Sequence, residues 1–427
     1  MRLPRQLPPS LRALEVRNYR LFASGQLLSL TGRWMFATAQ DWLVVELGGH
    51  GIALGLTTAL QFLPTLLFGP WGGVLADRLD KRRVLLATQL GFGVLAAALS
   101  TLVLTGVATV GLVWGLALVY GCLVAIDTPT RQAFVPEMVG PGHLTNAVAL
   151  NSVTFNSARI VGPALAGLLI SVFDTGPVFA ITAVSYAGVL SGLLRMRATE
   201  LHPSPRLAKG RGQVREGIAY VRGRPDILLV MAMVAVVGVV GLNFAITLAL
   251  MAKHFHGGAQ SYGLLSSTLA VGSLSGAILA TRRARPRQRT LVLACIAFGV
   301  AETVAAFAPS ALTLALLLIP VGFSVLTFTT TANTSIQLAA GPQMRGRVMA
   351  LYLFVFLGTT PIGGPLVGLL CQSAGPRAGL ALGGLGSLAA GLAAGVWLLR
   401  RQCQAGVEHS LRELVSGVVD REHARAA

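Results

Sequence analysis

The chain contains twelve long apolar stretches separated by short polar segments. A helix needs about 20 apolar residues to cross the hydrocarbon core of a bilayer, and these stretches are of that order of length. They fall near residues 21–46, 53–76, 84–105, 109–126, 144–171, 176–194, 226–251, 259–281, 289–308, 310–334, 344–371 and 377–400. The sequence therefore predicts an all-α membrane protein with twelve transmembrane helices.

The composition agrees with a membrane protein and argues against a soluble enzyme. Of the 427 residues, 54% are hydrophobic and only 12% are charged, too few to cover a soluble surface. The four cysteines show no paired spacing that would indicate a disulfide framework or a zinc site. There is no phosphate-binding Gly-Lys-Ser/Thr motif and no Ser-His-Asp arrangement. We expect no enzymatic activity, no catalytic residue, no cofactor and no metal.

The net charge of +18 reflects membrane topology rather than nucleic-acid binding. Of the 34 Lys and Arg residues, Arg33 and Arg159 fall inside apolar runs, and Lys253 and Arg377 fall in loops on one side. The remaining 30 all fall on the other side, which the positive-inside rule makes the cytoplasmic side. We therefore expect both termini in the cytoplasm, a cell-membrane location and contacts between these bases and anionic lipids.

The twelve stretches form two sets of six that share a pattern. Gly167 lies 17 residues after Leu150, and Gly368 lies 17 residues after Leu351. Such repeats are typical of transporters with a substrate site between two halves. We predict an N-terminal six-helix bundle (residues 1–194), a basic cytoplasmic linker (195–225), a C-terminal bundle (226–401) and a cytoplasmic tail (402–427). The tail has apolar residues at helical spacing, which favours a short helix against the inner membrane face or the bundle.

The loop between the second and third stretches reads G-G-V-L-A-D-R-L-D-K-R-R from Gly72 to Arg83. It resembles the gating loop of the major facilitator superfamily, with matches at Gly73, Leu75, Ala76, Asp77, Arg78, Lys81 and Arg82, and with Asp80 in place of a glycine. The resemblance implies that Asp77 caps the eleventh helix near Gln343. It also implies that Lys81 or Arg82 pairs with Asp127 at the inner end of helix four. The alternative is an ordinary positive-inside loop.

A second motif lies in the fifth stretch, where Arg159 precedes the run from Gly162 through Pro163 to Gly167. Proline bends a helix, and glycine lets a neighbouring helix come close. The run resembles the antiporter motif of drug/proton exchangers in the same superfamily. A plain helix-packing role for Gly162, Pro163 and Gly167 is the alternative.

The chain most resembles the bacterial exporters known as transmembrane secretion effectors, which include the enterobactin exporter and the macrolide efflux proteins. The matching segments are R-N-Y-R-L-F from Arg17, P-x-R-Q-A-F from Pro129, A-x-A-L-N from Ala147 and A-R-x-x-G-P from Ala158. They cover most of the N-terminal half. In the C-terminal half the match rests chiefly on Gly346-Arg347-Val348 and the Gly-Pro helix.

Polar residues inside the apolar stretches are candidates for the substrate or proton pathway. Gln26, Ser29, Arg33 and Gln40 share one face of the first helix, which should face protein or a water-filled cavity. Asp41 is the candidate proton carrier, or else an acid near the outer end of that helix that is solvated or satisfied by backbone donors. Arg159 is either a structural clamp or a contact for substrate or gating. Four more candidates, which could equally serve as interhelical contacts, are Asn243, Thr327, Thr331 and Asn333.

Together these features predict a monomeric secondary transporter that exports amphipathic small molecules, such as a drug, siderophore or secondary metabolite. Alternating access coupled to inward proton movement would drive it. Two alternatives remain at this point: an importer or lipid translocator with the same architecture, and a non-transporting membrane sensor or scaffold. An intact gating loop favours transport, because a scaffold has no use for a gate.

Overall fold

The computed structural model describes residues 8–202, 213–281, 288–341 and 343–426, and in these ranges the chain is almost entirely helical. The first half contains a short 3-10 helix (Pro9–Glu15) and helices α1 (Arg17–Glu46), α2 (Gly51–Arg78), α3 (Lys81–Leu104), α4 (Val110–Phe173) and α5 (Thr175–Leu194). A second 3-10 helix (Ala198–Glu200) and α6 (Gln213–Arg222) follow. The second half contains α7 (Pro225–Val240), α8 (Phe244–His254), α9 (Gly258–Thr281), α10 (Gln288–Ala306), α11 (Ala311–Ala339), α12 (Arg345–Ala374) and α13 (Pro376–Ala426).

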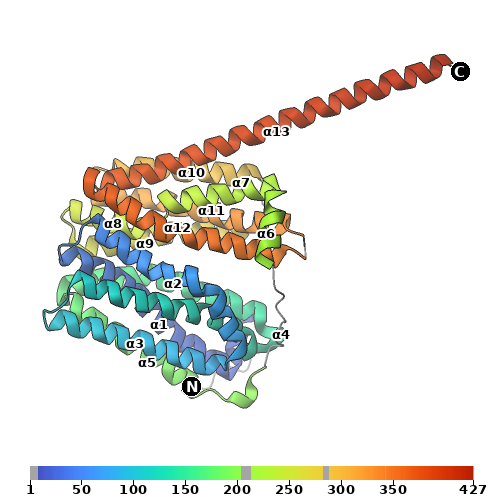
Figure 1. Cartoon of the computed structure of the whole chain (residues 1–427). Coiled ribbons are helices and arrows are strands. Elements are labelled where there is room, and N and C mark those ends of the chain that lie inside the picture. The colour runs from blue at the N-terminus through green and yellow to red at the C-terminus, as the bar shows by residue number, and fades with distance from the viewer. Residues whose placement is uncertain (1–7, 203–212, 282–287, 342, 427) are drawn as a thin grey trace.

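These helices supply the twelve predicted crossings. Ten helical segments of the described chain are long and apolar enough to span a membrane, with α7 and α8 counted as one segment. The longest of them, α4, contains two crossings that meet at Gly140. The 30-residue helix α1, which is not among the ten segments, supplies the twelfth crossing. Figure 1 shows α1–α5 packed together on one side and α7–α13 on the other.

The division of α4 has a local cause. Gly140 has φ 65° and ψ 178°, a conformation open almost only to glycine, and Pro141 follows it. The predicted fourth helix ended near residue 126, but the structure continues it to this turn. The extra turns matter because they place Asp127, Arg131 and Glu137 on the same helical segment as Tyr120, which lines the cavity described below.

The seventh crossing is broken in its middle. α7 ends at Val240, α8 begins at Phe244, and the Asn243 side chain donates a hydrogen bond (2.7 Å) to the carbonyl of Val239, which the break leaves without a helical partner. Irregular backbone at membrane depth is tolerated where protein or a cavity surrounds it. The predicted span near residues 226–251 is present as one crossing, and the structure adds the break within it.

The loops divide the molecule into two faces. The basic face carries the α2–α3 loop, the turn at Gly140 and α6; the opposite face carries the loops at residues 47–50, 105–109 and 255–257. Near the opposite face, helices of the two halves touch through glycines. A Cβ atom on Gly263 would collide with the carbonyl oxygen of Pro163, and one on Gly55 would collide with that of Gly364.

These two glycine contacts are related by the sequence repeat. Gly167 of α4 packs on Ala259 and Gln260 of α9, and Gly368 of α12 packs on Gly51 and Ile52 of α2. The equivalent glycine of each half therefore contacts the other half at an equivalent place. The result is a pseudo-symmetric pair of six-helix bundles, closed against each other near the opposite face.

The predicted linker (195–225) and the predicted tail (402–427) are the two remaining segments. The predicted linker includes α6, whose Tyr220 hydroxyl accepts a hydrogen bond from the backbone amide of Gly341 and whose Glu216 pairs with Arg347. The tail was expected to form a short helix on the inner membrane face or against the bundle; in the structure it continues α13 and extends beyond the bundle in Figure 1. Residues 203–212 of the linker lie outside the described residues.

Candidate substrate cavity

A cavity of about 460 Å³ lies between the two halves. It is lined from the first half by α1, α2 and α4, and from the second half by the broken seventh crossing and α9. Its lining residues are Arg33, Trp34, Ala37, Thr38, Asp41, Thr58, Gln61, Phe62, Tyr120, Phe155, Arg159, Pro163, Leu242, Phe244, Ala245, Leu248, Tyr262, Ser266 and Leu269. Mostly apolar walls with a few polar groups are typical of small-molecule sites, and the volume suits a drug-sized ligand.

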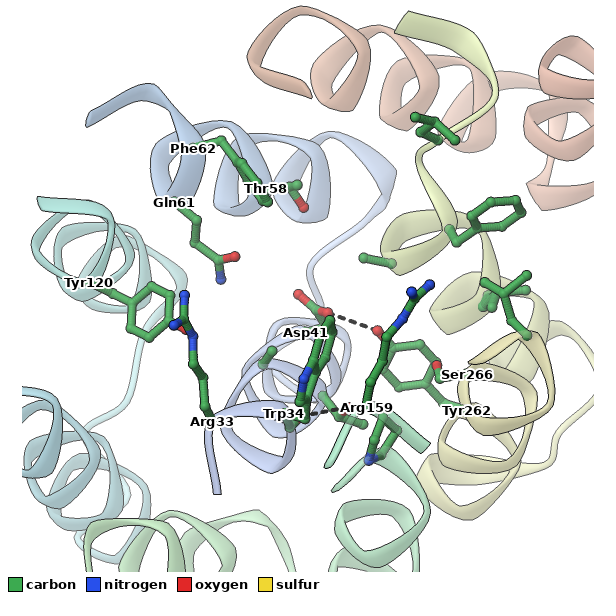
Figure 2. Close-up of a pocket in the computed structure, with 18 of the residues that line it drawn as sticks. Arg33, Trp34, Asp41, Thr58, Gln61, Phe62, Tyr120, Arg159, Tyr262 and Ser266 are labelled. Atoms are coloured by element: carbon green, nitrogen blue, oxygen red, sulfur yellow. Dashed lines mark hydrogen bonds between the residues drawn. The ribbon is translucent and has the colours of Figure 1, made fainter. Parts of the chain in front are cut away.

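Asp41 lies at the centre of this cavity and connects the two halves. Its carboxylate accepts a hydrogen bond of 2.8 Å from the Tyr262 hydroxyl of α9, as Figure 2 shows. Only 6% of Asp41 is exposed, so the alternative of a solvated acid at the end of the helix does not hold. Trp42, the next residue, stacks on the Tyr262 ring with centroids 6.4 Å apart and holds the tyrosine in place.

Arg33 lines the cavity on the side of the first half. Its Nε donates a hydrogen bond of 3.0 Å to the Tyr120 hydroxyl, and its guanidinium lies 5.8 Å from the centre of the Phe92 ring. Figure 2 shows Arg33 beside Tyr120 and well apart from Asp41. Aromatic faces and a phenol thus stabilise the cation in place of an acid.

Arg159 lies on the other side of Asp41 in Figure 2, near the second half. Its guanidinium is 6.0 Å from the centre of the Trp34 ring, and one terminal nitrogen is 3.4 Å from the Ser273 hydroxyl of α9. Both partners are neutral, and the hydrogen bond is long. Within the described residues the side chain therefore joins the halves only weakly, which leaves its guanidinium available to the cavity.

A smaller cavity of about 220 Å³ adjoins the main one on the side of the basic face. The two share Arg33 and Phe155, and the smaller one is also lined by Gln26, Leu30, Thr128, Arg131, Gln132 and Asn151. The amide nitrogen of Gln26 lies 3.4 Å from the side-chain oxygen of Asn151. The polar stripe predicted on α1 thus faces a cavity at Gln26 and Arg33.

Four other predicted pathway residues, and Gln40, do not line the cavity. Gln40 accepts a hydrogen bond of 2.9 Å from Gln61, which does line it. Asn243 belongs to the helix break, and its neighbours Leu242 and Phe244 face the cavity instead. In α11, the Thr331 hydroxyl bonds to the backbone of Thr327, and Asn333 bonds to Gln337.

The ionic contacts at the basic face differ from those that the resemblance implied. Lys81 pairs with Glu137 at 2.7 Å rather than with Asp127. Asp127 is fully buried and pairs with Arg131 at 2.7 Å; its other carboxylate oxygen accepts hydrogen bonds from Thr88 and Gln89. The expected Asp127 pairing was wrong because α4 runs about three turns further than predicted, which brings Glu137 beside the start of α3.

Two further residues at the α2–α3 loop make hydrogen bonds within the first half. Asp80, which replaces the family's glycine, caps α3 by accepting a hydrogen bond of 3.0 Å from the Arg83 amide. Arg82 donates hydrogen bonds to the carbonyls of Leu193 and Leu194 at the end of α5, whereas Arg78 is exposed. The predicted gating positions Gly73 and Asp77 lie in the part of α2 whose side chains are outside the described residues.

The Gly-Pro motif lies where α4 meets both α1 and the second half. Gly162 packs against Trp34 and the carbonyl of Thr31, and Gly167 packs against α9. Pro163 lines the cavity, and its carbonyl faces Gly263. Gly162 and Gly167 therefore pack closely through their own lack of a side chain, and Pro163 does so through Gly263.

Sequence reasoning did not single out Tyr120, Tyr262 or Gln61, although these residues hold the predicted polar groups in place. A phenol or amide inside an apolar run is a weak signal, because many such side chains serve only in helix packing. Glu137 was missed for another reason: it lay beyond the predicted end of helix four.

Comparison with known proteins agrees with the geometry. Residues 10–423 match the model of the family described as transmembrane secretion effector. The multidrug efflux pump Tap of Mycolicibacterium fortuitum is 28% identical over 84% of this chain and 90% of its own length. Macrolide efflux protein A of Streptococcus pyogenes is 25% identical over 82% of this chain and 88% of its own length. The staphyloferrin A transporter of Staphylococcus aureus is 30% identical, but the match spans only 39% of this chain and 42% of that protein.

Solved structures support the fold alone. A point mutant of the nucleoside transporter NupG superposes with a TM-score of 0.73 at 13% identity and covers 89% of this chain and 99% of its own. A bacterial homologue of the iron transporter ferroportin has a TM-score of 0.68 at 14% identity and covers 89% of this chain and 98% of its own. Two six-helix halves, a central cavity and the family match together place this multi-pass membrane protein in the transmembrane secretion effector family of the major facilitator superfamily.

Proposed function

We propose that this protein exports amphipathic small molecules from the cytoplasm by alternating access, driven by inward movement of protons. The observation that carries the proposal is the hydrogen bond between Asp41 and Tyr262 inside a cavity that both halves line. A carboxyl group that joins two moving bodies can couple its own protonation to their separation.

The position of the cavity supports export. The halves are closed by glycine contacts near the opposite face, and the smaller cavity lies on the side of the basic face. If the basic face is cytoplasmic, as the positive-inside rule requires, a substrate enters from the cytoplasm in this state. Both termini are then cytoplasmic, in the cell membrane, and anionic lipids contact the bases of that face.

Three groups of residues have distinct roles in this proposal. Arg33, Arg159 and Gln26 contact the substrate, and Asp41 carries the proton. On the basic face, the Lys81–Glu137 pair joins α3 to α4 and keeps the first half rigid as it moves. At the opposite face, the glycine contacts of Gly167 and Gly368 form when the outer side closes and separate when it opens.

The named functions of the relatives fit this proposal. Multidrug efflux by the Tap pumps and macrolide efflux by macrolide efflux protein A call for an apolar cavity that discriminates weakly. A further relative is named for the transport of staphyloferrin A. The present cavity combines aromatic walls with two arginines, and so accommodates substrates that have both an apolar and a polar part.

Accumulation in everted membrane vesicles tests the direction. Energised vesicles that contain the protein should take up an exported dye or siderophore, and vesicles without the protein should not. An uncoupler should abolish the uptake. Loss of preloaded compound from the same vesicles, with no uptake, would instead identify an importer.

A further inference from the structure

The strongest unexplained feature of the cavity is its charge. Three arginines face the two adjoining cavities, Arg33, Arg131 and Arg159, whereas Asp41 is the single carboxylate among their described lining residues. Arg131 is neutralised by the buried Asp127 at 2.7 Å. Two cations therefore face one acid, and the acid already accepts a hydrogen bond from Tyr262.

Neither of the two remaining arginines has an anionic partner within the described part of the chain. Arg33 bonds to the Tyr120 hydroxyl, and Arg159 bonds to the Ser273 hydroxyl. A guanidinium carries five N–H donors, so most donors of both side chains stay unused in these contacts. Asp127 attracts Arg33 through space, but its oxygens are occupied by Arg131, Thr88 and Gln89.

Such cations are costly at membrane depth unless an anion joins them. A carboxylate or phosphate on a bound molecule would supply that partner through charge-assisted, often bidentate hydrogen bonds. The apolar remainder of the molecule would rest on the aromatic walls of the cavity, which include Trp34, Phe62, Phe155 and Phe244.

We propose that the cavity selects amphipathic anions, with Arg33 and Arg159, which lie on either side of Asp41, as two separate residues that bind anionic groups of the substrate. This inference rests on the proposed transport function but is narrower, because an apolar cavity alone would accept cations, neutral molecules and anions alike. Even with Asp41 ionised, one positive charge remains in excess, which repels lipophilic cations.

Binding of two dyes with one aromatic frame tests the selection. Fluorescein is an anion at pH 7.5, and rhodamine 123 carries an ester on the same frame and is a cation. The purified full-length protein in nanodiscs of zwitterionic lipid should bind fluorescein at least tenfold more tightly than rhodamine 123. Equal or tighter binding of rhodamine 123 would overturn the inference.

Variants assign the preference to the two arginines. Arg33→Gln and Arg159→Gln should each weaken fluorescein binding by about tenfold or more, the amount expected for one charge-assisted hydrogen bond, and leave rhodamine 123 unchanged or tighter. Arg159→Lys keeps the charge and should lose less. Arg377→Gln, an arginine of the opposite face that bonds to the carbonyl of Ala308, is the matched control and should change nothing. Equal losses for both dyes would contradict the assignment.

Transport of the same dyes separates this inference from the proposed function. Uptake of rhodamine 123 but not fluorescein into everted vesicles would overturn anion selection and support export. Saturable fluorescein binding without uptake of either dye would overturn export and support the anion site. Uptake of fluorescein alone is the result that both proposals predict.

Discussion

The Tyr262 hydroxyl donates a 2.8 Å hydrogen bond to the carboxylate of Asp41 across the boundary between the two halves. The two residues are 221 positions apart in the sequence and lie on α1 and α9. Opening the opposite face must separate these helices, so this contact has to break in every transport cycle. Most of the following predictions depend on that requirement.

Asp41→Asn should abolish transport driven by a pH gradient, because an amide cannot carry the proton. Substrate exchange at equal pH on both sides should persist, because it needs no proton movement. Glu46→Gln is the control, since Glu46 lies on the same helix but is exposed and bonds to Thr175 outside the cavity. Gradient-driven transport at the wild-type rate in Asp41→Asn would contradict the proton-carrier role.

Tyr262→Phe should favour the state that is open at the opposite face. The lost hydrogen bond is worth about 0.5–1.5 kcal/mol, which shifts the equilibrium about two- to thirteenfold. Spin labels at Thr105 and Ser310, two exposed loop residues of different halves, would report the longer distance once the native cysteines are replaced. Tyr352→Phe removes a buried hydroxyl away from the cavity and should leave the distance distribution as it is.

Gly263→Ala should hinder closure at the opposite face, because the added Cβ would collide with the Pro163 carbonyl. Overpacking of this kind costs about 1–3 kcal/mol, and the cost falls only on the closed state. Transport should decrease about tenfold or more while the protein still inserts in the membrane. Gly115→Ala in α4, where nothing lies within 4 Å, should transport normally. Normal transport by both variants would rule out the glycine contact as a gate.

Lys81 and Glu137 should depend on each other. Their side chains are only 12% and 11% exposed, so Lys81→Glu or Glu137→Lys alone places two like charges in contact and should destabilise the first half by about 1–3 kcal/mol. The double exchange should recover much of the loss, and thermal unfolding in detergent would measure it. Independent, additive effects would show that the pair makes no energetic contribution.

Bilayer thickness explains why the sequence predicted the helices so well. Any crossing must be long and apolar, so the lengths of the apolar runs predicted the number and the approximate positions of the twelve spans. The repeat likewise predicted that Gly167 and Gly368 are equivalent, and both pack on the other half. The break at Asn243 was not predicted, because Leu242 and Phe244 on either side are as apolar as the helices they interrupt.

The contacts of the site were less predictable than its residues. The stripe on α1 predicted that Arg33 faces a cavity, and Asp41 was predicted separately as a proton carrier, but their partners Tyr120 and Tyr262 come from other helices. No local pattern states how two bundles dock. Glu137 shows the same difficulty on a smaller scale: helix ends follow caps and turns such as Gly140, which hydrophobicity alone does not locate.

Proton-coupled transport by the purified protein tests the central claim most directly. Proteoliposomes with a fixed protein orientation would be loaded with buffer of one pH, diluted into another, and followed for fluorescein movement. The account predicts accumulation on the more acidic side, collapse of the accumulation with an uncoupler, and none with Asp41→Asn. Accumulation that ignores the pH gradient, or that persists in Asp41→Asn, would contradict it.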